Sequence, residues 1–253
     1  MKIQYCSDLH LEFPDNREYI RQNPIKPVGD ILILAGDIIP FARRELADNF
    51  FDTVSNDFKQ VYWVPGNHEY YGYNIQDLNG LVSDQIRDNV WLTSNSGVVT
   101  IEGVNLIFST LWSKISLDAE RIIQRSVSDF RNIGYQSQNL TVANFNQMHH
   151  ACLSYIWQSL PKDKGDTTIV VTHHVPTFLN YPAEYQGDII NEAFGVELHD
   201  LIHDANIDHW IYGHHHRNIP DFEVNGTKLT TNQLGYLHYG EQAGFDATKI
   251  IEI

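Results

Sequence analysis

The sequence predicts a mixed α/β fold in which short apolar strands end abruptly in acidic residues and histidines. Five such runs occur, and each is rich in β-branched or aromatic residues. Continuous apolar runs of this length are typical of strands buried on both faces of a sheet. In open α/β sheets, ligands bind beyond the carboxyl ends of the strands. The runs and the residues that follow them are 3–6 with Ser7-Asp8, 30–35 with Gly36-Asp37, 61–64 with Pro65-Gly66-Asn67-His68-Glu69, 168–171 with Thr172-His173-His174, and 207–212 with Gly213-His214-His215-His216.

Two hairpin signals add antiparallel pairs to this pattern. Glu102-Gly103 separates two alternating runs within 98–111, and Asn225-Gly226 separates two more near the end of the chain. Residues 248–253 are expected to form a closing strand. Two mixed sheets covered by helices are therefore expected in place of a single doubly wound sheet. The spacing of apolar residues predicts the helices at 43–58, 75–86, 149–160 and 192–205.

Length and composition favour one domain over residues 1–253, because 253 residues with 42% hydrophobic content suffice for one substantial core. The polar segment 113–145 is expected to be helical and to cover the site as a lid. A formal net charge of −15 argues against a long nucleic acid as partner. No feature of the sequence indicates an oligomeric state.

The cellular location is predicted to be cytoplasmic. The chain has only two cysteines, Cys6 and Cys152, without a Cys-x-x-Cys spacing, which indicates a reducing compartment. No apolar segment approaches the roughly 18 residues of a membrane helix, and no leader precedes the first motif, so no membrane contact is expected.

The residues after the five strands form a candidate metal site. Asp8 and His10 lie two positions apart, so both can turn toward one cation, and Gly36 lets the backbone bend before Asp37. This mixture of oxygen and imidazole ligands suits Mn²⁺, Fe, Zn²⁺, Co²⁺ or Ni²⁺ better than Ca²⁺ or Mg²⁺. The candidate ligands are Asp8, His10, Asp37, Asn67, His173, His214 and His216.

The order of these motifs resembles the metallophosphoesterase family, also called calcineurin-like phosphoesterases, from Asp8 to His216. The resemblance implies a four-layer α/β/β/α sandwich with two mixed sheets. It implies that His68 does not bind metal but acts on the substrate as proton donor or phosphate stabiliser. His174 and His215, which flank motif positions, are then expected behind the ligands or facing solvent. The implied ligand sets, with Asp37 bridging, are Asp8, His10, Asp37 and His216 for one metal and Asp37, Asn67, His173 and His214 for the other.

Together these features predict a metal-dependent phosphoric ester hydrolase with two divalent cations, Mn²⁺ first and Fe or Zn²⁺ as alternatives. Two cations about 3.5–4 Å apart lower the pKa of a shared water, and the bridging hydroxide attacks a phosphomonoester or phosphodiester. His68 then protonates the departing alkoxide. Glu69 is expected to orient His68 or a ligand, or to be a simple helix-entry carboxylate. The alternatives are a Ser/Thr-type protein phosphatase and a noncatalytic metal-binding scaffold.

Residues that select the substrate are less well marked. Arg131 could bind a substrate phosphate or carboxylate bidentately, or pair with Asp129 inside the lid. The aromatic residues just past the ligand motifs either line the pocket or pack in the core. These residues are Tyr70, Tyr71, Phe178 and Tyr181.

Overall fold

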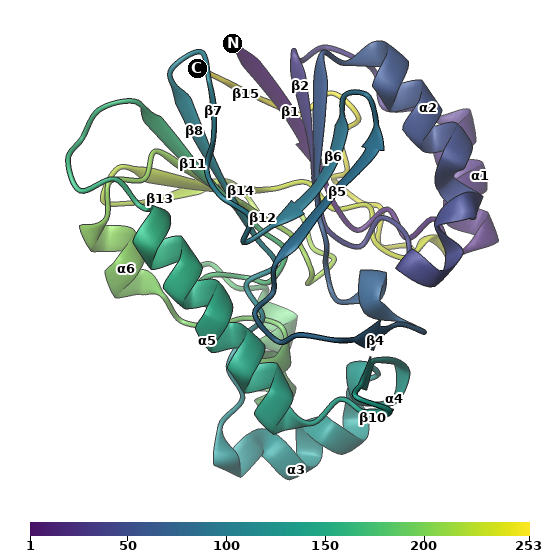
Figure 1. Ribbon diagram of the computed structural model, residues 1–253, viewed down its shortest axis with the longest axis vertical. Helices are drawn as coiled ribbons and strands as arrows, with labels where there is room; N and C mark the ends of the chain where they lie inside the picture. Colours follow the sequence, from purple (N-terminus) through teal and green to yellow (C-terminus); the bar gives the residue numbers. More distant parts are fainter.

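The computed structural model describes all residues from 1 to 253 and confirms a mixed α/β fold (Figure 1). The first large sheet has six strands, of which the inner four run parallel and the two edge strands antiparallel. Their order is β15 (Ile250–Glu252), β1 (Lys2–Cys6), β2 (Ile31–Ala35), β3 (Gln60–Val64), β6 (Val90–Ser94) and β5 (Val82–Arg87).

The second large sheet repeats this arrangement, with four parallel strands between two antiparallel edges. Its order is β13 (Phe222–Val224), β14 (Thr227–Thr231), β12 (His209–Tyr212), β11 (Thr167–Thr172), β8 (Val104–Ser109) and β7 (Val99–Ile101). Both predicted hairpins, β7–β8 and β13–β14, are confirmed, and β15 is the predicted closing strand. A third, small sheet orders β10 (Gln138–Asn139), β9 (Gly134–Tyr135) and β4 (Asn74–Ile75).

Both faces of each large sheet are buried, which explains the continuous apolar runs. In β2, Ile31 and Ile33 belong to a core shared with Phe108 of the second sheet, whereas Leu32 and Leu34 belong to a core on the outer face. This alternation follows from the two-residue period of a strand. The two sheets therefore pack on each other through one core and present their other faces to helices.

Helices cover the outer faces of both sheets (Figure 1). α1 (Pro14–Gln22) and α2 (Asp48–Asp57) contribute Ile20 and Phe51 to the outer core of the first sheet. α5 (Val142–Ser159) and α6 (His199–Asp204) contribute Ile156 and Ile202 to that of the second. No helix of the structure combines the length and apolar character that crossing a membrane requires.

The predicted helix at 75–86 is wrong. Asp77 accepts a hydrogen bond from the backbone N–H of Asn79, and Asn79 accepts one from Leu81, at 3.0 and 2.8 Å. Such bonds compete with a helical backbone, and Gly80 adopts a φ of +69°. The chain then continues into β5, which pairs with β6.

The other predicted helices are present with changed limits. The segment 43–58 divides into the 3₁₀ helix η1 (Phe41–Ala47) and α2. The segment 149–160 lies within the longer α5, whose start is fixed by a capping box between Thr141 and Asn144. The segment 192–205 divides into the end of η4 (Ile189–Ala193) and α6, because the backbone between them pairs with Val175.

The segment 113–145 is mainly helical and has an apolar core of its own. It contains α3 (Leu117–Ser126), α4 (Asp129–Asn132), the hairpin β9–β10 and the start of α5. Ile123 and Phe130 of this segment pack with Trp112 and Phe145.

Candidate metal centre

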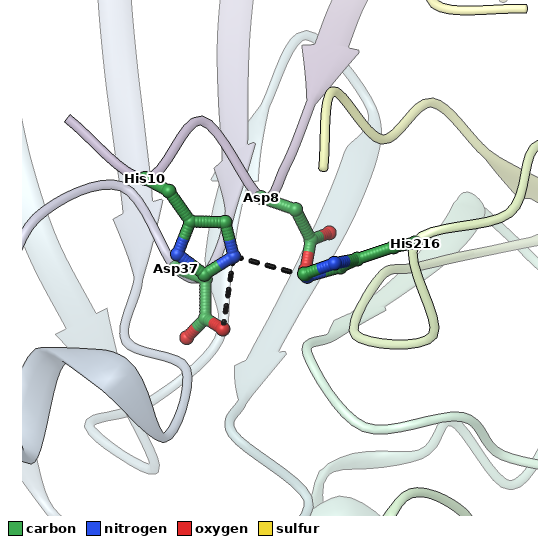
Figure 2. A group of neighbouring side chains, drawn as sticks. All are labelled: Asp8, His10, Asp37 and His216. Atoms are coloured by element: carbon green, nitrogen blue, oxygen red, sulfur yellow. Dashed lines mark hydrogen bonds and ion pairs between the residues drawn. The ribbon is translucent and has the colours of Figure 1, made fainter. Parts of the chain in front are cut away.

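The loops after five strands of the two sheets converge at one point and bring all seven predicted ligands together. Asp8, His10, Asp37 and His216 form one group, which Figure 2 shows, and Asp37, His173 and His214 form another. Within each group the potential ligand atoms lie within 4.8 Å of one another. The two groups share Asp37, as a bridging carboxylate requires.

In the first group, two imidazole nitrogens face each other. His10 Nδ1 lies 3.2 Å from Glu12 Oε1, and His216 Nδ1 lies 2.6 Å from Glu241 Oε2. A carboxylate only accepts, so both Nδ1 atoms donate, and in the neutral rings both Nε2 atoms present lone pairs. These Nε2 atoms are 3.0 Å apart (Figure 2). Two ligands held about 2.1 Å from one cation are separated by about 3.0–3.4 Å, so the pair fits a metal.

Carboxylate oxygens complete the first group. His10 Nε2 lies 3.7 Å from Asp37 Oδ2, and His216 Nε2 lies 3.3 Å from Asp8 Oδ1. The histidines that donate their second nitrogen to a carboxylate show the pattern typical of metal-bound histidine, in which the outer hydrogen bond fixes the ring. Two imidazoles and two carboxylates thus surround one space.

The second group has a similar arrangement around His173. Its Nδ1 donates to the carbonyl oxygen of Ala35 at 3.0 Å, so in the neutral ring its Nε2 carries a lone pair. Nε2 lies 3.0 Å from His214 Nδ1, 3.2 Å from Asn67 Oδ1 and 3.3 Å from Asp37 Oδ2. These distances again equal the spacing of neighbouring ligands on one cation.

Asp129 sets the orientation of the Asn67 amide. Asn67 Nδ2 donates to Asp129 Oδ1 at 2.8 Å, which turns the amide oxygen toward His173. Tyr71 donates its hydroxyl to the same Asp129 oxygen at 2.8 Å. Asp129 comes from α4, so the segment 113–145 takes part in building the second group.

The backbone of five of the seven candidate ligands adopts the left-handed region that L-residues rarely enter. Positive φ occurs at Asp8 (56°), His10 (47°), Asp37 (56°), His214 (82°) and His216 (52°). Each such residue costs roughly 1–3 kcal/mol and persists only where the surroundings impose it. This clustering of strained positions is typical of a functional site.

Glycines beside the ligands are required by close approach. A Cβ on Gly36 lies 2.2 Å from His173 Nδ1, and one on Gly66 lies 2.2 Å from Asp37 Oδ1. A Cβ on Gly213 lies 2.6 Å from Asp8 Oδ2. The glycines of the three motifs therefore make space for ligand side chains from neighbouring loops.

The buried carboxylates of the cluster require positive charge beside them. Burial by itself lowers the pKa of His216, but Asp8 and Glu241 outweigh it and raise the pKa to about 10. Asp37 likewise outweighs burial and raises the pKa of His173 to about 9. Burial acts to raise the pKa of Asp37, yet His173 and its neighbours hold it well below the usual range. Protons on the histidines or metal cations can supply this charge, so the donor set fits a divalent metal pair.

His68 lies at the edge of both groups with one nitrogen directed into a cavity. Its backbone N–H donates to Asp37 Oδ1 at 2.9 Å, and its Nδ1 lies 3.0 Å from Glu12 Oε1. Its ring stacks on Tyr71 at 4.0 Å between centroids, and its Nε2 lies 3.1 Å from the Tyr236 hydroxyl. Burial lowers the pKa of His68, but Asp37 and Glu12 outweigh it, and the pKa is raised.

Glu69 supports the ligand loops and does not contact His68. Its carboxylate accepts backbone N–H bonds from Asp37, Ile38 and Gly66 at 2.9, 2.7 and 2.7 Å. The indole N–H of Trp63 donates to it at 3.1 Å. Of the predicted alternatives, the structure supports the one in which Glu69 orients a ligand, by fixing the loops that carry Asp37 and Asn67.

The remaining candidates divide between the site and its surroundings. His174 and His215 are both buried, so neither faces bulk solvent, and His215 also forms part of the wall of the cavity over the site. Arg131 is exposed and outside the site, because its guanidinium donates to the carbonyl oxygens of Arg125 and Ser126. It does not pair with Asp129 either.

Among the aromatic candidates, Tyr71 and Tyr181 line the cavity, whereas Tyr70 belongs to the core around Trp112. Phe178 packs with the core on the outer face of the second sheet.

Sequence reasoning missed several residues that complete the site. Glu12 could have been found from its alternation with Asp8 and His10, because residues two apart share a side of an extended loop. No local pattern marks the others, since they reach the site from distant parts of the chain. They are Asp129, Tyr236 and Glu241.

A cavity of about 650 Å³ opens over both groups. His68, His214 and His216 form part of its wall, and aromatic rings form much of the remainder. A space of this size admits a small organic molecule.

Comparisons with known proteins agree with this geometry. Residues 1–218 match the model of the family described as calcineurin-like phosphoesterase, and the chain belongs to that family. It is a metal-dependent phosphoric ester hydrolase. An uncharacterized protein, L509, of Acanthamoeba polyphaga mimivirus is 33% identical over 277 residues, which cover 99% of this chain and 96% of the viral protein.

A solved structure shares the fold. The phosphopantetheinyl hydrolase PptH from Mycobacterium tuberculosis superimposes with a TM-score of 0.72. The likeness covers 99% of this chain and 95% of that one, at 17% sequence identity. This similarity supports the architecture described above.

Proposed function

We propose that the protein hydrolyses a small phosphomonoester or phosphodiester at a dinuclear metal centre. This proposal rests on the two groups of potential metal-ligand atoms that share Asp37. Each places two imidazole nitrogens 3.0 Å apart, the spacing of neighbouring ligands on one cation. The family uses two divalent metals in general, and this chain retains a full donor set for both.

The first cation would be held by Asp8, His10, Asp37 and His216, and the second by Asp37, Asn67, His173 and His214. When bound, such a pair supplies an activated water and neutralises charge on the phosphoryl oxygens. Mn²⁺ is the proposed metal, with Fe or Zn²⁺ as alternatives, because the ligands combine carboxylate, amide and imidazole groups.

His68 is proposed as the proton donor to the leaving group. Glu12 accepts from its Nδ1 and thereby directs Nε2 into the cavity, toward the Tyr236 hydroxyl. The Tyr71 ring stacks on the face of the His68 imidazole and limits its rotation. An imidazolium in this position can transfer the Nε2 proton to an ester oxygen, a contribution of about 10²- to 10⁴-fold in rate.

The segment 113–145 is proposed to act as a cover over the site within a single domain. Ser126, Val127, Ser128 and Asp129 of this segment line the cavity. A cover excludes bulk water and strengthens the electrostatic interactions below it. The cytoplasmic location is part of the same proposal and rests on Cys6 and Cys152, which are both unpaired and buried.

The test is hydrolysis of p-nitrophenyl phosphate and bis-p-nitrophenyl phosphate by the purified chain with Mn²⁺, Fe²⁺ or Zn²⁺. Asp37→Ala is the matched variant, because it removes the bridging carboxylate from both groups. We expect two metal equivalents per chain and a loss of activity of at least 10³-fold in the variant. Equal activity of the two proteins would overturn the dinuclear mechanism.

A further inference from the structure

The wall of the cavity over the metal centre contains no lysine or arginine. Sites that bind several phosphate groups ordinarily supply such cations, because each phosphate needs charge-assisted hydrogen bonds. The nearest candidate, Arg217, is already paired. Its Nε donates to Glu184 at 2.9 Å, its Nη1 lies 3.7 Å from Glu241, and its guanidinium covers the Tyr185 ring.

Carboxylates line the cavity beyond the metal ligands. Glu241 holds His216, and Asp188 stands exposed at the wall, where it accepts the backbone N–H of Ile190 at 3.0 Å. A second anionic group on a substrate would face these carboxylates with no lysine or arginine to pair it. Like charges a few ångströms apart at a protein surface repel by enough to change binding about tenfold or more.

Aromatic rings supply the other notable part of the wall. Phe13, Tyr236 and Tyr239 contact one another, with centroids 5.4 Å apart for the first pair and 6.0 Å for the second. Tyr185 and Phe194 line the cavity from the segment that follows β11. Tyr239, in the 3₁₀ helix η5 (Leu237–Tyr239), is 72% exposed, so its ring is available to a ligand.

We propose that the enzyme selects an ester with one phosphate group and a flat, uncharged ring as its organic group. The phosphate binds at the metal centre, the ring stacks on the aromatic wall, and a second phosphate is rejected. Stacking of one planar ring on aromatic side chains contributes about tenfold or more to binding. This inference rests on the proposed function, since it describes the substrate of that same site.

The test compares diesters that share the p-nitrophenolate leaving group, using the full chain loaded with Mn²⁺. The second substituent is ethyl, hexyl, phenyl or 5′-thymidyl, and a fifth ester carries an additional 3′-phosphate on the thymidyl group. We expect kcat/KM for the phenyl or thymidyl ester to exceed that for both alkyl esters about tenfold or more. The phenyl and thymidyl arms show whether a simple aryl group or a nucleobase is the preferred ring. The additional phosphate should lower kcat/KM by about tenfold or more.

Variants assign these preferences to particular side chains. Tyr239→Ala should reduce the ratio of ring to ethyl ester, whereas Trp157→Ala, which removes a 63% exposed ring on α5 outside the cavity, should not. Asp188→Asn keeps the hydrogen bond to Ile190 but removes the charge, so the penalty for the additional phosphate should shrink. Asp200→Asn, at an exposed position of α6, is the matched control.

The outcomes separate the two proposals. Metal-dependent release of p-nitrophenol with no preference among substituents would overturn the substrate inference alone. A hexyl ester as good as the ring esters would do the same, because it shows apolar burial without ring recognition. No release from any of these diesters or from p-nitrophenyl phosphate, with Mn²⁺, Fe²⁺ or Zn²⁺, would overturn the proposed function itself.

Discussion

Glu69→Gln tests how the ligand loops are held together. Every partner of this buried carboxylate is an N–H donor. Oε2 accepts from Asp37 and Gly66, and Oε1 accepts from Ile38, Trp63 and, at 3.4 Å, Ile39. A glutamine keeps one oxygen and replaces the other by an NH₂ group, which itself donates. In either orientation of the amide, at least two buried N–H groups lose their acceptor.

The expected loss of stability follows from that count. A buried donor without a partner costs about 1–3 kcal/mol, so two cost about 2–6 kcal/mol. In a chain of this size each kcal/mol lowers Tm by about 2–4 °C, which predicts a decrease of about 4–24 °C. The loosened loops also carry Asp37 and Asn67, so metal affinity should fall about 10- to 100-fold.

Thermal unfolding by circular dichroism and metal titration by calorimetry measure the two effects. Glu18→Gln is the control, because this exposed residue contacts only Arg21 and Gln22, and the change should stay within about 0.5 kcal/mol. Burial and the Asp37 charge raise the pKa of Glu69 to about 8, whereas the backbone N–H groups lower it. If Glu69→Gln melts and binds metal like the wild type, Glu69 behaves as a neutral group and our account of these loops is refuted.

Three further substitutions and one chelation experiment probe the site. Gly36→Ala places a Cβ 2.2 Å from His173 Nδ1, so elemental analysis should find one metal equivalent lost; retention of both would mean that the loops yield easily. Glu12→Gln removes the charge that His10 and His68 share, and turnover at saturating Mn²⁺ should fall about tenfold or more; unchanged turnover contradicts the positioning role. His68→Ala should lower kcat about 10²- to 10⁴-fold with both metals retained, and loss of a metal equivalent would instead place His68 among the ligands. When the free metal concentration is about 1,000 times Kd, addition of a chelator should lower Tm by about 8–16 °C in a melting scan. An unchanged Tm would exclude metal binding to the folded state.

Much of the fold was predictable because its determinants are local. Each inner strand that carries a site motif combines an apolar run with a polar stop, and both signals lie within ten residues. β2 is an example, where Ile31–Ala35 ends at Gly36-Asp37. Asn225-Gly226 likewise specifies its own turn. The convergence of the strand ends then follows from the parallel arrangement of the sheets.

The failure at 75–86 shows where local patterns mislead. Ile75, Leu78 and Val82 have helical spacing, but the first two pack in the core near Trp112. Val82 starts an edge strand whose pairing with β6 outweighs helical propensity. Pairing partners distant in sequence cannot be read from the segment itself.

The supporting carboxylates of the site could not be predicted from the sequence for a different reason. The chain has 32 aspartates and glutamates, and nothing near Asp129 or Glu241 distinguishes them from the rest. Glu241 lies 25 positions from His216, and Asp129 lies 62 positions from Asn67. Only the folded loops bring these pairs within hydrogen-bond distance. Arg131, in contrast, was chosen for its chemistry, and its guanidinium instead binds the last carbonyl oxygens of α3, the preceding helix.

The left-handed backbone at Asp8, His10, Asp37, His214 and His216 has a consequence for how this protein changes over generations. Glycine relieves the strain at each of these positions, so a substitution that removes a ligand also relaxes the chain. Lineages that no longer need the activity should therefore accumulate glycine at these positions and gain stability. Recovery of catalysis would require strained ligand residues to return at several positions together. Loss of catalysis in this fold should therefore occur more readily than its recovery.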